Sequence, residues 1–322
     1  MYFPYFRGRQ NELIAIRELV DAKLLSDKII PIVEPVKVSS TLVKTLTTFK
    51  NKHKKIVYIV NPAVGSYLRD LEVPKNNKIM SSIDEVISSN SRGLYQENPL
   101  ILGMILESNL ESMQNYREYY NGNHEWLAVC TEIDALHHYA NVFVDEESGY
   151  NLIPDDASFR RRLQTNKIML ANRFKKLERN TDYEGVENIY SEDHLYYNSE
   201  GYFGFSDYSI VGDEYSETGF APYAVAIHIV YFDKNKALRI KHFVSDSNND
   251  INNPAGKFAE ALEKLMKWKD ENEKTTFLNT LAMRKFQELY EKESYPGLGS
   301  VKKFSIMHHL ELMSKFLEGD IT

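Results

Sequence analysis

Polar residues follow a series of apolar runs in this sequence, and their positions point to one shared pocket. The runs are rich in aliphatic and β-branched residues, as in parallel strands that are covered on both faces. The polar residues at their ends are Glu34, Asn61, Glu107, Glu132, Asp145, Asn172 and Arg173, and later Asp207, His228, His242 and Asp246. Because ligands of α/β folds bind at the carboxyl ends of parallel strands, we expect these residues to converge.

The carboxylates of this set are candidates for a metal site. Hard divalent cations prefer clustered carboxylate oxygens. We expect Glu34, Asp145, Asp207 and Asp246 to bind Mg²⁺ or Mn²⁺, which would polarise a phosphoryl oxygen. Glu34 lies within VEPV and Asp207 within GFSDYS, so both are expected to be buried and to need a partner. The alternative for each acid is a structural role as a helix cap or turn residue.

His242 is expected to act as general acid or base, because its place in RIKHFVSDS allows it to face one side of a strand. Arg9 and Arg173 are expected to neutralise a bound phosphate. The same two cations offer a non-catalytic explanation, since either one would pair with Glu34. The predicted catalytic residues are Glu34, Asp207 and His242. The sequence contains no zinc-protease spacing, Walker-type loop, Gly-rich dinucleotide turn or nucleophile elbow.

Composition limits the classes of function. A net charge of −7 argues against a general polyanion-binding surface, so a phosphate contact would need a local basic patch such as residues 160–179. A salt-bridged surface is the alternative there. One cysteine, Cys130, excludes an intrachain disulfide framework. The amino terminus lacks a signal-peptide core and no apolar run approaches about 18 residues, so we expect a cytoplasmic protein. The 21 tyrosines suit a lined cleft or an interface as well as a core.

The elements that would position these residues alternate along the chain. Apolar strands are expected at 29–36, 55–62, 99–107, 125–132, 141–146 and 167–174. Helices are expected between them, at 10–25, 41–52, 81–90, 111–120 and 158–163. This alternation predicts parallel pairing through right-handed crossovers. With the later candidates there are about eight strands, the number that a closed β/α barrel requires.

The pattern changes after residue 200. A glycine-bearing strand is expected at 201–212, and 224–245 predicts two antiparallel strands around an Asp-Lys-Asn-Lys turn. From 254 onward the chain is expected to be helical. The predicted fold is a distorted TIM-barrel-like β/α fold with a late β-hairpin and C-terminal helices, or alternatively an open sheet with an added hairpin. No linker marks a boundary, so 1–322 is predicted to be a single domain in which 254–322 is the mainly helical part.

Several long segments together resemble a known family. They are YFPYFRGRQNELIAIREL, IIPIVEPVK, IVNPAVG, GFSDYSIVGDEYSETGFAPYAVAIHIVY, LRIKHFVSDSNNDINNPAGKFAEAL and YPGLGSVKKFSIMHHLELM. The pattern resembles the bacterial branch of the phage beta-protein family, and is weakest between about 65 and 165. The resemblance implies a barrel-like α/β fold, a gene in mobile or defence-associated neighbourhoods, and a small nuclease-like protein encoded nearby. The positions that match by motif are Gly8, Arg9, Glu12, Glu34, Pro35, Asn61, Asp207, His242, Ser245, Asp246 and His308, and no catalytic role comes with them.

Two functions follow as hypotheses. In the first, a defence-associated protein acts with a partner and recognises a phosphate-bearing ligand or nucleic acid, and in its enzymatic form hydrolyses a phosphodiester with a metal. Its ligand-binding residues would be Arg9, Asn61, Arg173 and Ser245. In the second, the chain is a non-catalytic interaction module whose Tyr-rich surface and three C-terminal helices dock the nuclease-like partner, and the strand-end residues are structural. A sugar-active barrel with two carboxylates is a third alternative.

Overall fold

The computed structural model describes residues 1–321, except 89–97, 122–123, 144–147, 217–221 and 273–278. The chain forms two compact units. The first comprises Met1–Asp21, Asp27–Ala171 and Tyr196–Tyr208, and the second comprises Ala22–Ser26, Asn172–Leu195 and Ser209–Thr322. The prediction of a single domain stays a prediction, because the chain passes repeatedly from one unit to the other and neither is a continuous segment.

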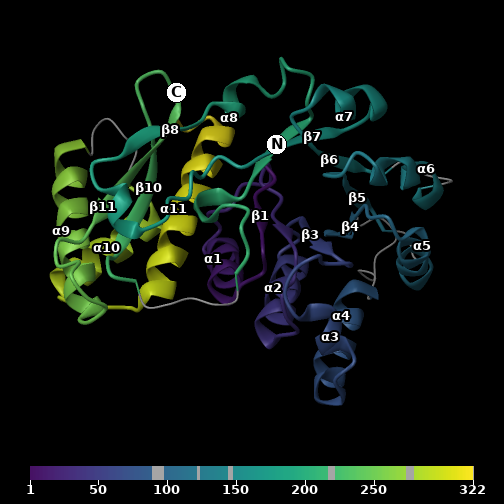
Figure 1. The fold of residues 1–322 in the computed structure, drawn as a ribbon, viewed down its shortest axis with the longest axis horizontal. Coiled ribbons are helices and arrows are strands. Elements are labelled where there is room, and N and C mark those ends of the chain that lie inside the picture. The colour runs from purple at the N-terminus through teal and green to yellow at the C-terminus, as the bar shows by residue number, and fades with distance from the viewer. Residues whose placement is uncertain (89–97, 122–123, 144–147, 217–221, 273–278, 322) are drawn as a thin grey trace. The chain divides into compact units, whose positions relative to one another are not determined.

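The first unit is a barrel of parallel strands (Figure 1). Within the described residues its sheet has eight strands, in the order β1-β2-β3-β4-β5-β6-β7-β9, and every neighbouring pair is parallel. The strands are β1 (Tyr5–Phe6), β2 (Ile32–Val33), β3 (Ile56–Ile59), β4 (Leu100–Ile105), β5 (Trp126–Val129), β6 (Tyr150–Pro154), β7 (Lys167–Ala171) and β9 (Gly204–Asp207). A parallel bridge between Tyr2 and Phe205 joins the two ends of the sheet. The predicted TIM-barrel-like fold class is therefore confirmed.

Helices connect the strands on the outside of the barrel (Figure 1). They are α1 (Gln10–Asp21), α2 (Ser40–Asn51), α3 (Tyr67–Leu71), α4 (Asn77–Ser88), α5 (Leu110–Tyr119), α6 (Tyr139–Val142) and α7 (Ala157–Arg162), with short 3₁₀ turns at Pro74–Asn76 and Ala135–His138. Side chains cap several of them where the sequence favours it. Ser39 accepts a hydrogen bond from the Leu42 amide at 3.2 Å, and Asn109 accepts one from the Ser112 amide at 3.1 Å.

Alternate residues of each strand fill the inside of the barrel. One continuous core contains Phe3, Tyr5, Ile30, Ile32, Val57, Ile59, Ile101, Leu127, Val129, Tyr150, Leu152, Ile168 and Leu170. Their spacing of two means that the intervening side chains, such as Tyr58, point outward toward the helices. Gly103 takes an inward position, where an added Cβ would lie 2.4 Å from Ile59 Cδ1. The interior is thus a packed core.

One predicted strand is wrong. Residues 141–146, NVFVDE, were expected to be an apolar strand that ends on Asp145. The structure instead places Tyr139–Val142 in α6, residues 144–146 lie outside the described residues, and the strand of this repeat is β6, Tyr150–Pro154. The cause is that YNLIP carries an asparagine and a proline and so hides its strand character, while NVFV imitates a buried strand. Asn151 is accommodated because its side chain donates to the Thr165 carbonyl at 3.0 Å.

The second unit contains a small antiparallel sheet and three long helices (Figure 1). Its described strands are β8 (Glu187–Ser191), β10 (Ala226–Phe232) and β11 (Leu238–Val244), in the order β10-β11-β8. Its helices are α9 (Pro254–Asn272), α10 (Leu281–Glu291) and α11 (Leu298–Glu318), with 3₁₀ turns at Asn180–Tyr183 and Ser209–Val211 and a short α8 (Asp193–Tyr196) where the chain leaves the unit. The predicted hairpin and C-terminal helices are confirmed. None of the described helices is long and apolar enough to cross a bilayer.

Candidate functional site

Glu34 lies at the mouth of the barrel, just beyond the carboxyl end of β2, and is fully buried. Its carboxylate accepts a hydrogen bond from the Tyr5 hydroxyl at 2.7 Å and one from the Ala63 amide at 2.8 Å. It also forms an ion pair with Arg7. Arg9 and Arg173 were the expected partners, whereas Arg7, two residues before Arg9, fills that role. Three donors from the protein therefore use three of the about four acceptor sites of this carboxylate, and little of it is left to direct at a substrate.

The Arg7 guanidinium lies beside two neighbouring aromatic rings, whose centres are 5.2 Å apart. Its Cζ lies 5.4 Å from the centre of the Tyr5 ring and 5.5 Å from that of Tyr208. Burial by itself would lower the pKa of Arg7, but the neighbouring Glu34 carboxylate outweighs it and the net change is a rise. Burial raises the pKa of Tyr5, and the Glu34 charge raises it further. The group is thus a rigid charged plug in which every member has a partner.

Asn61, predicted to bind a ligand, joins two strands of the barrel. Its side-chain amide donates to the Ile105 carbonyl at 2.8 Å, and its side-chain oxygen accepts from the Ile105 amide at 2.9 Å. The two bonds continue the pairing of β3 with β4 beyond the end of the ladder, where the backbone would otherwise lack partners. This structural role explains why an asparagine follows β3, and no bound ligand is needed to explain it.

Asp207 and Glu34 face different sides of the barrel wall. Glu34 continues the inward alternation of Ile30 and Ile32. Asp207 is two residues after Phe205 in β9, so the two side chains lie on the same face of the strand. Phe205 stacks on Tyr2 with ring centres 4.9 Å apart and lies outside the interior core, so this face points outward. Asp207 accepts a hydrogen bond from the Tyr2 hydroxyl at 2.7 Å. The two acids are therefore at one end of the barrel but do not point into one space. Arg9 lies just before α1, and its amide donates to Glu12 at 3.2 Å.

The remaining described site residues belong to the second unit. His242 lies directly opposite His228 in the hairpin, with their Nδ1 atoms 2.6 Å apart. Burial lowers the pKa of His242 to about 4 and that of His228 to about 3. One Nδ1 must be a donor and the other an acceptor, so a proton on both would break the bond. His242 and Arg173 line one cavity of about 60 Å³, which has room for a water molecule or two.

The other predicted residues of this unit have partners within it. Arg173 forms two hydrogen bonds to Asp193, at 2.6 and 2.8 Å. Ser245 accepts a hydrogen bond from the Val225 amide at 3.0 Å. Asp246 is exposed and lies 2.7 Å from Lys264. Asp145 lies outside the described residues. The part of the chain that is described holds no group of three or more His, Cys, Asp or Glu arranged for a metal, and the predicted metal set, which includes Asp145, stays a prediction.

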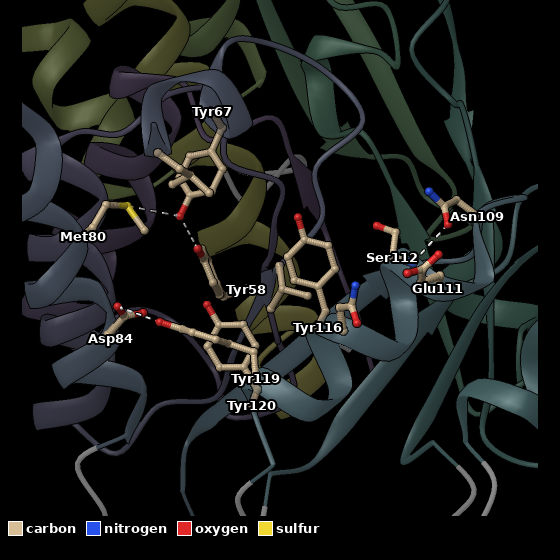
Figure 2. A pocket seen from close by; sticks show the side chains of 13 residues that line it. Tyr58, Tyr67, Met80, Asp84, Asn109, Glu111, Ser112, Tyr116, Tyr119 and Tyr120 are labelled. Carbon is tan, nitrogen blue, oxygen red and sulfur yellow. Dashed lines mark hydrogen bonds between the residues drawn. The ribbon is translucent and has the colours of Figure 1, made fainter. Parts of the chain in front are cut away.

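A tyrosine-lined cavity of about 650 Å³ lies on the outside of the barrel wall, and it is called here the tyrosine pocket (Figure 2). The strand β3, the helices α3 and α4, and the helix α5 with its two caps line it. Its described lining residues are Tyr58, Val60, Tyr67, Leu71, Met80, Asp84, Asn109, Glu111, Ser112, Asn115, Tyr116, Tyr119 and Tyr120. Tyr58 reaches it because neighbouring strand residues point into the barrel. Its volume falls within the usual range for small-molecule sites.

Hydrogen bonds hold part of the tyrosine pocket in place (Figure 2). The Tyr58 and Tyr67 hydroxyls are hydrogen-bonded to each other, and Tyr119 donates to Asp84 Oδ2 at 3.2 Å. Burial raises the pKa of Tyr67 to about 12, and burial together with nearby Tyr67 and Asp84 raises that of Tyr120. Burial also raises the pKa of Asp84, against the lowering effect of the Tyr119 hydrogen bond. At neutral pH the rings are therefore uncharged phenols.

Sequence reasoning missed this pocket, although one signal was present. In the helix expected at 111–120, Tyr116, Tyr119 and Tyr120 have the spacing i, i+3, i+4, which places three rings on one helix face. Such a stripe alone is more typical of a packed core. Only the approach of α4 and of the outward side of β3 distinguishes a cavity from a core here.

Comparison of the chain with family models, with curated proteins and with solved structures found no match. The assignment of a function therefore depends on the geometry of the two units.

Proposed function

We propose that this chain is a ligand-binding protein, and that its ligand occupies the tyrosine pocket. The supporting observation is the contrast between two places on the same barrel. At the mouth, Glu34 is buried with three donors from the protein itself. On the outer wall, a cavity of about 650 Å³ combines aromatic rings with a few polar groups, which is the usual make-up of a small-molecule site.

Like the second hypothesis from the sequence, this proposal describes a non-catalytic protein. It differs in the binding site and in the ligand, which is a small molecule. The sequence assigned recognition to the C-terminal helices and to tyrosines in general. The tyrosine pocket gives that idea a definite place, with polar groups from Asn109, Ser112 and Asn115 beside the rings to orient a ligand. The plug formed by Tyr5, Arg7, Glu34 and Tyr208 then has the role of closing the end of the barrel.

The proposal is tested by blocking the pocket. Ser112 lies among the lining side chains (Figure 2), so Ser112→Trp would fill the cavity. Protein exchanged into a deproteinised cell extract and examined by native mass spectrometry should retain a small molecule as the wild type and lose it as Ser112→Trp. Gln114→Trp is the matched control, because it adds the same indole at an exposed position of the same helix. Equal retention by all three proteins, or retention by none, would contradict the proposal.

A second candidate function is the recognition of a phosphate-bearing ligand, and Arg7 is the residue that supports it. A guanidinium at the carboxyl end of β1 is where a barrel would bind a phosphate-bearing ligand, nucleic acid included. Metal-dependent phosphodiester hydrolysis would be its enzymatic form. From the family resemblance we also propose a defence-associated role and a nuclease-like partner encoded nearby, and from the hydropathy of the sequence a cytoplasmic location.

The second candidate predicts that ATP stabilises the barrel. Binding of ATP with Mg²⁺ at millimolar concentration should raise the melting temperature by several degrees, because a ligand that binds only the folded state shifts the unfolding equilibrium. Arg7→Lys keeps the charge but loses the planar fork, and should reduce the shift. An unchanged melting temperature for the wild type, measured by differential scanning fluorimetry, would count against this candidate.

A further inference from the structure

We propose that the ligand of the tyrosine pocket is an organic molecule that carries an alkylated ammonium group, and that the tyrosine rings and Asp84 bind this group. The inference rests on the proposed function, since it names the class of ligand for the same pocket. Three observations carry it: the number and closeness of the rings, the charges around them, and the size of the cavity.

The rings provide faces for a cation. Tyr58, Tyr67, Tyr116, Tyr119 and Tyr120 line the cavity, and the Tyr119 and Tyr120 ring centres lie 4.8 Å apart in an edge-to-face arrangement. The face of an aromatic ring carries partial negative charge, so a cation over several rings is attracted by each of them. Alkylated ammonium groups suit such a site because they are large, weakly hydrated and coated with apolar methyl or methylene groups.

The charges of the lining residues favour a cation as well. Of the described residues that line the pocket, none is lysine, arginine or histidine, and two, Asp84 and Glu111, are acidic. Asp84 Oδ2 accepts the Tyr119 hydroxyl, but Asp84 Oδ1 is buried and accepts no hydrogen bond within the described part of the chain. A buried carboxylate oxygen without a donor is costly, and the charge of a cation bound in the cavity would offset part of that cost. A phosphate group would be repelled by the negative charge of these acidic residues.

The cavity is larger than an ammonium group alone. At about 650 Å³ it has room for an organic body, and Asn109 and Ser112 lie on the other side from Asp84 (Figure 2). The ligand is therefore expected to carry its charged group among the rings and hydrogen-bonding groups at its other end. A bare metal ion would suit the pocket less, because metal ions need converging oxygen ligands where this pocket has ring faces.

Choline and its neutral isostere 3,3-dimethyl-1-butanol test the inference, because they share a shape and differ in charge. Isothermal titration should give choline an affinity at least about tenfold higher than that of the alcohol, the ratio that a desolvated cation–π site provides. Inorganic phosphate should neither bind nor compete. The protein is used as the full chain, and circular dichroism establishes that each variant is folded.

Substitutions then assign the effect to the pocket. Asp84→Asn keeps the shape and removes the charge, and should weaken choline binding about tenfold. Glu85→Gln is its control, because it makes the same charge change at the next, exposed residue of α4 and should leave binding unchanged. Tyr116→Phe keeps the ring and should retain binding, whereas Tyr116→Leu should lose it.

The outcomes separate the two proposals. Equal affinities for choline and the alcohol, with both lost in Ser112→Trp, would overturn the inference that the ligand is a cation. The proposal of a ligand-binding pocket would still hold. Choline binding that Ser112→Trp does not reduce would overturn the inference by placing the ligand elsewhere. Loss of choline binding in Asp84→Asn and Tyr116→Leu, with retention in Glu85→Gln and Tyr116→Phe, is the result that the inference predicts.

Discussion

Replacement of Glu34 by alanine is expected to lower the free energy of unfolding of the barrel by about 3–5 kcal/mol, as is typical when one member of a buried ion pair is removed. The variant leaves the Arg7 guanidinium without its carboxylate and leaves the Tyr5 hydroxyl and the Ala63 amide without their acceptor. Urea unfolding followed by Trp126 fluorescence reports on the barrel, because Trp126 lies in β5. A Trp268→Phe background removes the other tryptophan.

Two controls show whether the loss belongs to the buried pair. Glu85→Ala removes an exposed carboxylate from α4 and should change the unfolding free energy by no more than about 0.5 kcal/mol. The double variant Glu34→Leu with Arg7→Met replaces both charges by apolar groups and should recover much of the lost stability. If Glu34→Ala is as stable as the wild type, the description of Glu34 as a structural acid is wrong.

Acid is expected to unfold the second unit well above the pH at which carboxylates are normally protonated. Three histidines cause this: burial lowers the pKa of His228 and His309 to about 3 and that of His308 to about 4. Their hydrogen bonds suit the neutral ring. His308, for example, donates from Nε2 to the Val230 carbonyl at 2.8 Å and accepts at Nδ1 from the Thr280 hydroxyl at 2.8 Å.

The sign of the effect follows from proton linkage. In the unfolded chain a histidine has a pKa of about 6.5, so below that pH the unfolded state binds a proton that the folded state does not. Stability is therefore full above about pH 6.5 and falls as the pH falls toward the folded values. Each group contributes a slope of about 1.4 kcal/mol per pH unit, and the three together about 4 kcal/mol per pH unit. Two pH units would remove the stability of an ordinary domain.

Trp268 is a convenient reporter for this prediction, since it packs on Tyr231 and Phe243 within the second unit. In a Trp126→Phe background, its fluorescence should report urea midpoints that fall steeply between about pH 6.5 and pH 4.5. His309→Gln should flatten the slope by about a third, and His53→Gln, at an exposed position, should not change it. A midpoint that is constant over this range would contradict the neutral, buried state of these histidines.

The barrel could be predicted from the sequence because its strands and helices differ in periodicity. Continuous apolar runs of about six residues, separated by helical segments, specify parallel strands even when one run is assigned wrongly. The error at 141–146 did not change the fold, because a real strand at Tyr150–Pro154 occupies the same place in the order. The asparagine and proline of that strand made it hard to recognise in the sequence, and the apolar run NVFV was predicted as the strand in its place.

The site could not be predicted to the same extent, for a physical reason. A sequence shows which residues follow a strand but not which side of the wall they face. Glu34 follows β2 and Asp207 ends β9, yet one points inward to Arg7 and the other outward to Tyr2. The tyrosine pocket depends on how four elements pack together, β3, α3, α4 and α5, and only α5 carries a pattern that could have indicated it.

The most direct test of the account is to observe the tyrosines while choline is added. Ring-labelled tyrosine gives NMR signals from the tyrosine pocket and from the barrel mouth in one spectrum, and single Tyr→Phe variants assign them. The account predicts shifts for Tyr58, Tyr67, Tyr116, Tyr119 and Tyr120 that saturate together, and none for Tyr5 or Tyr208. Shifts of Tyr5 and Tyr208 with an unchanged tyrosine pocket would contradict it.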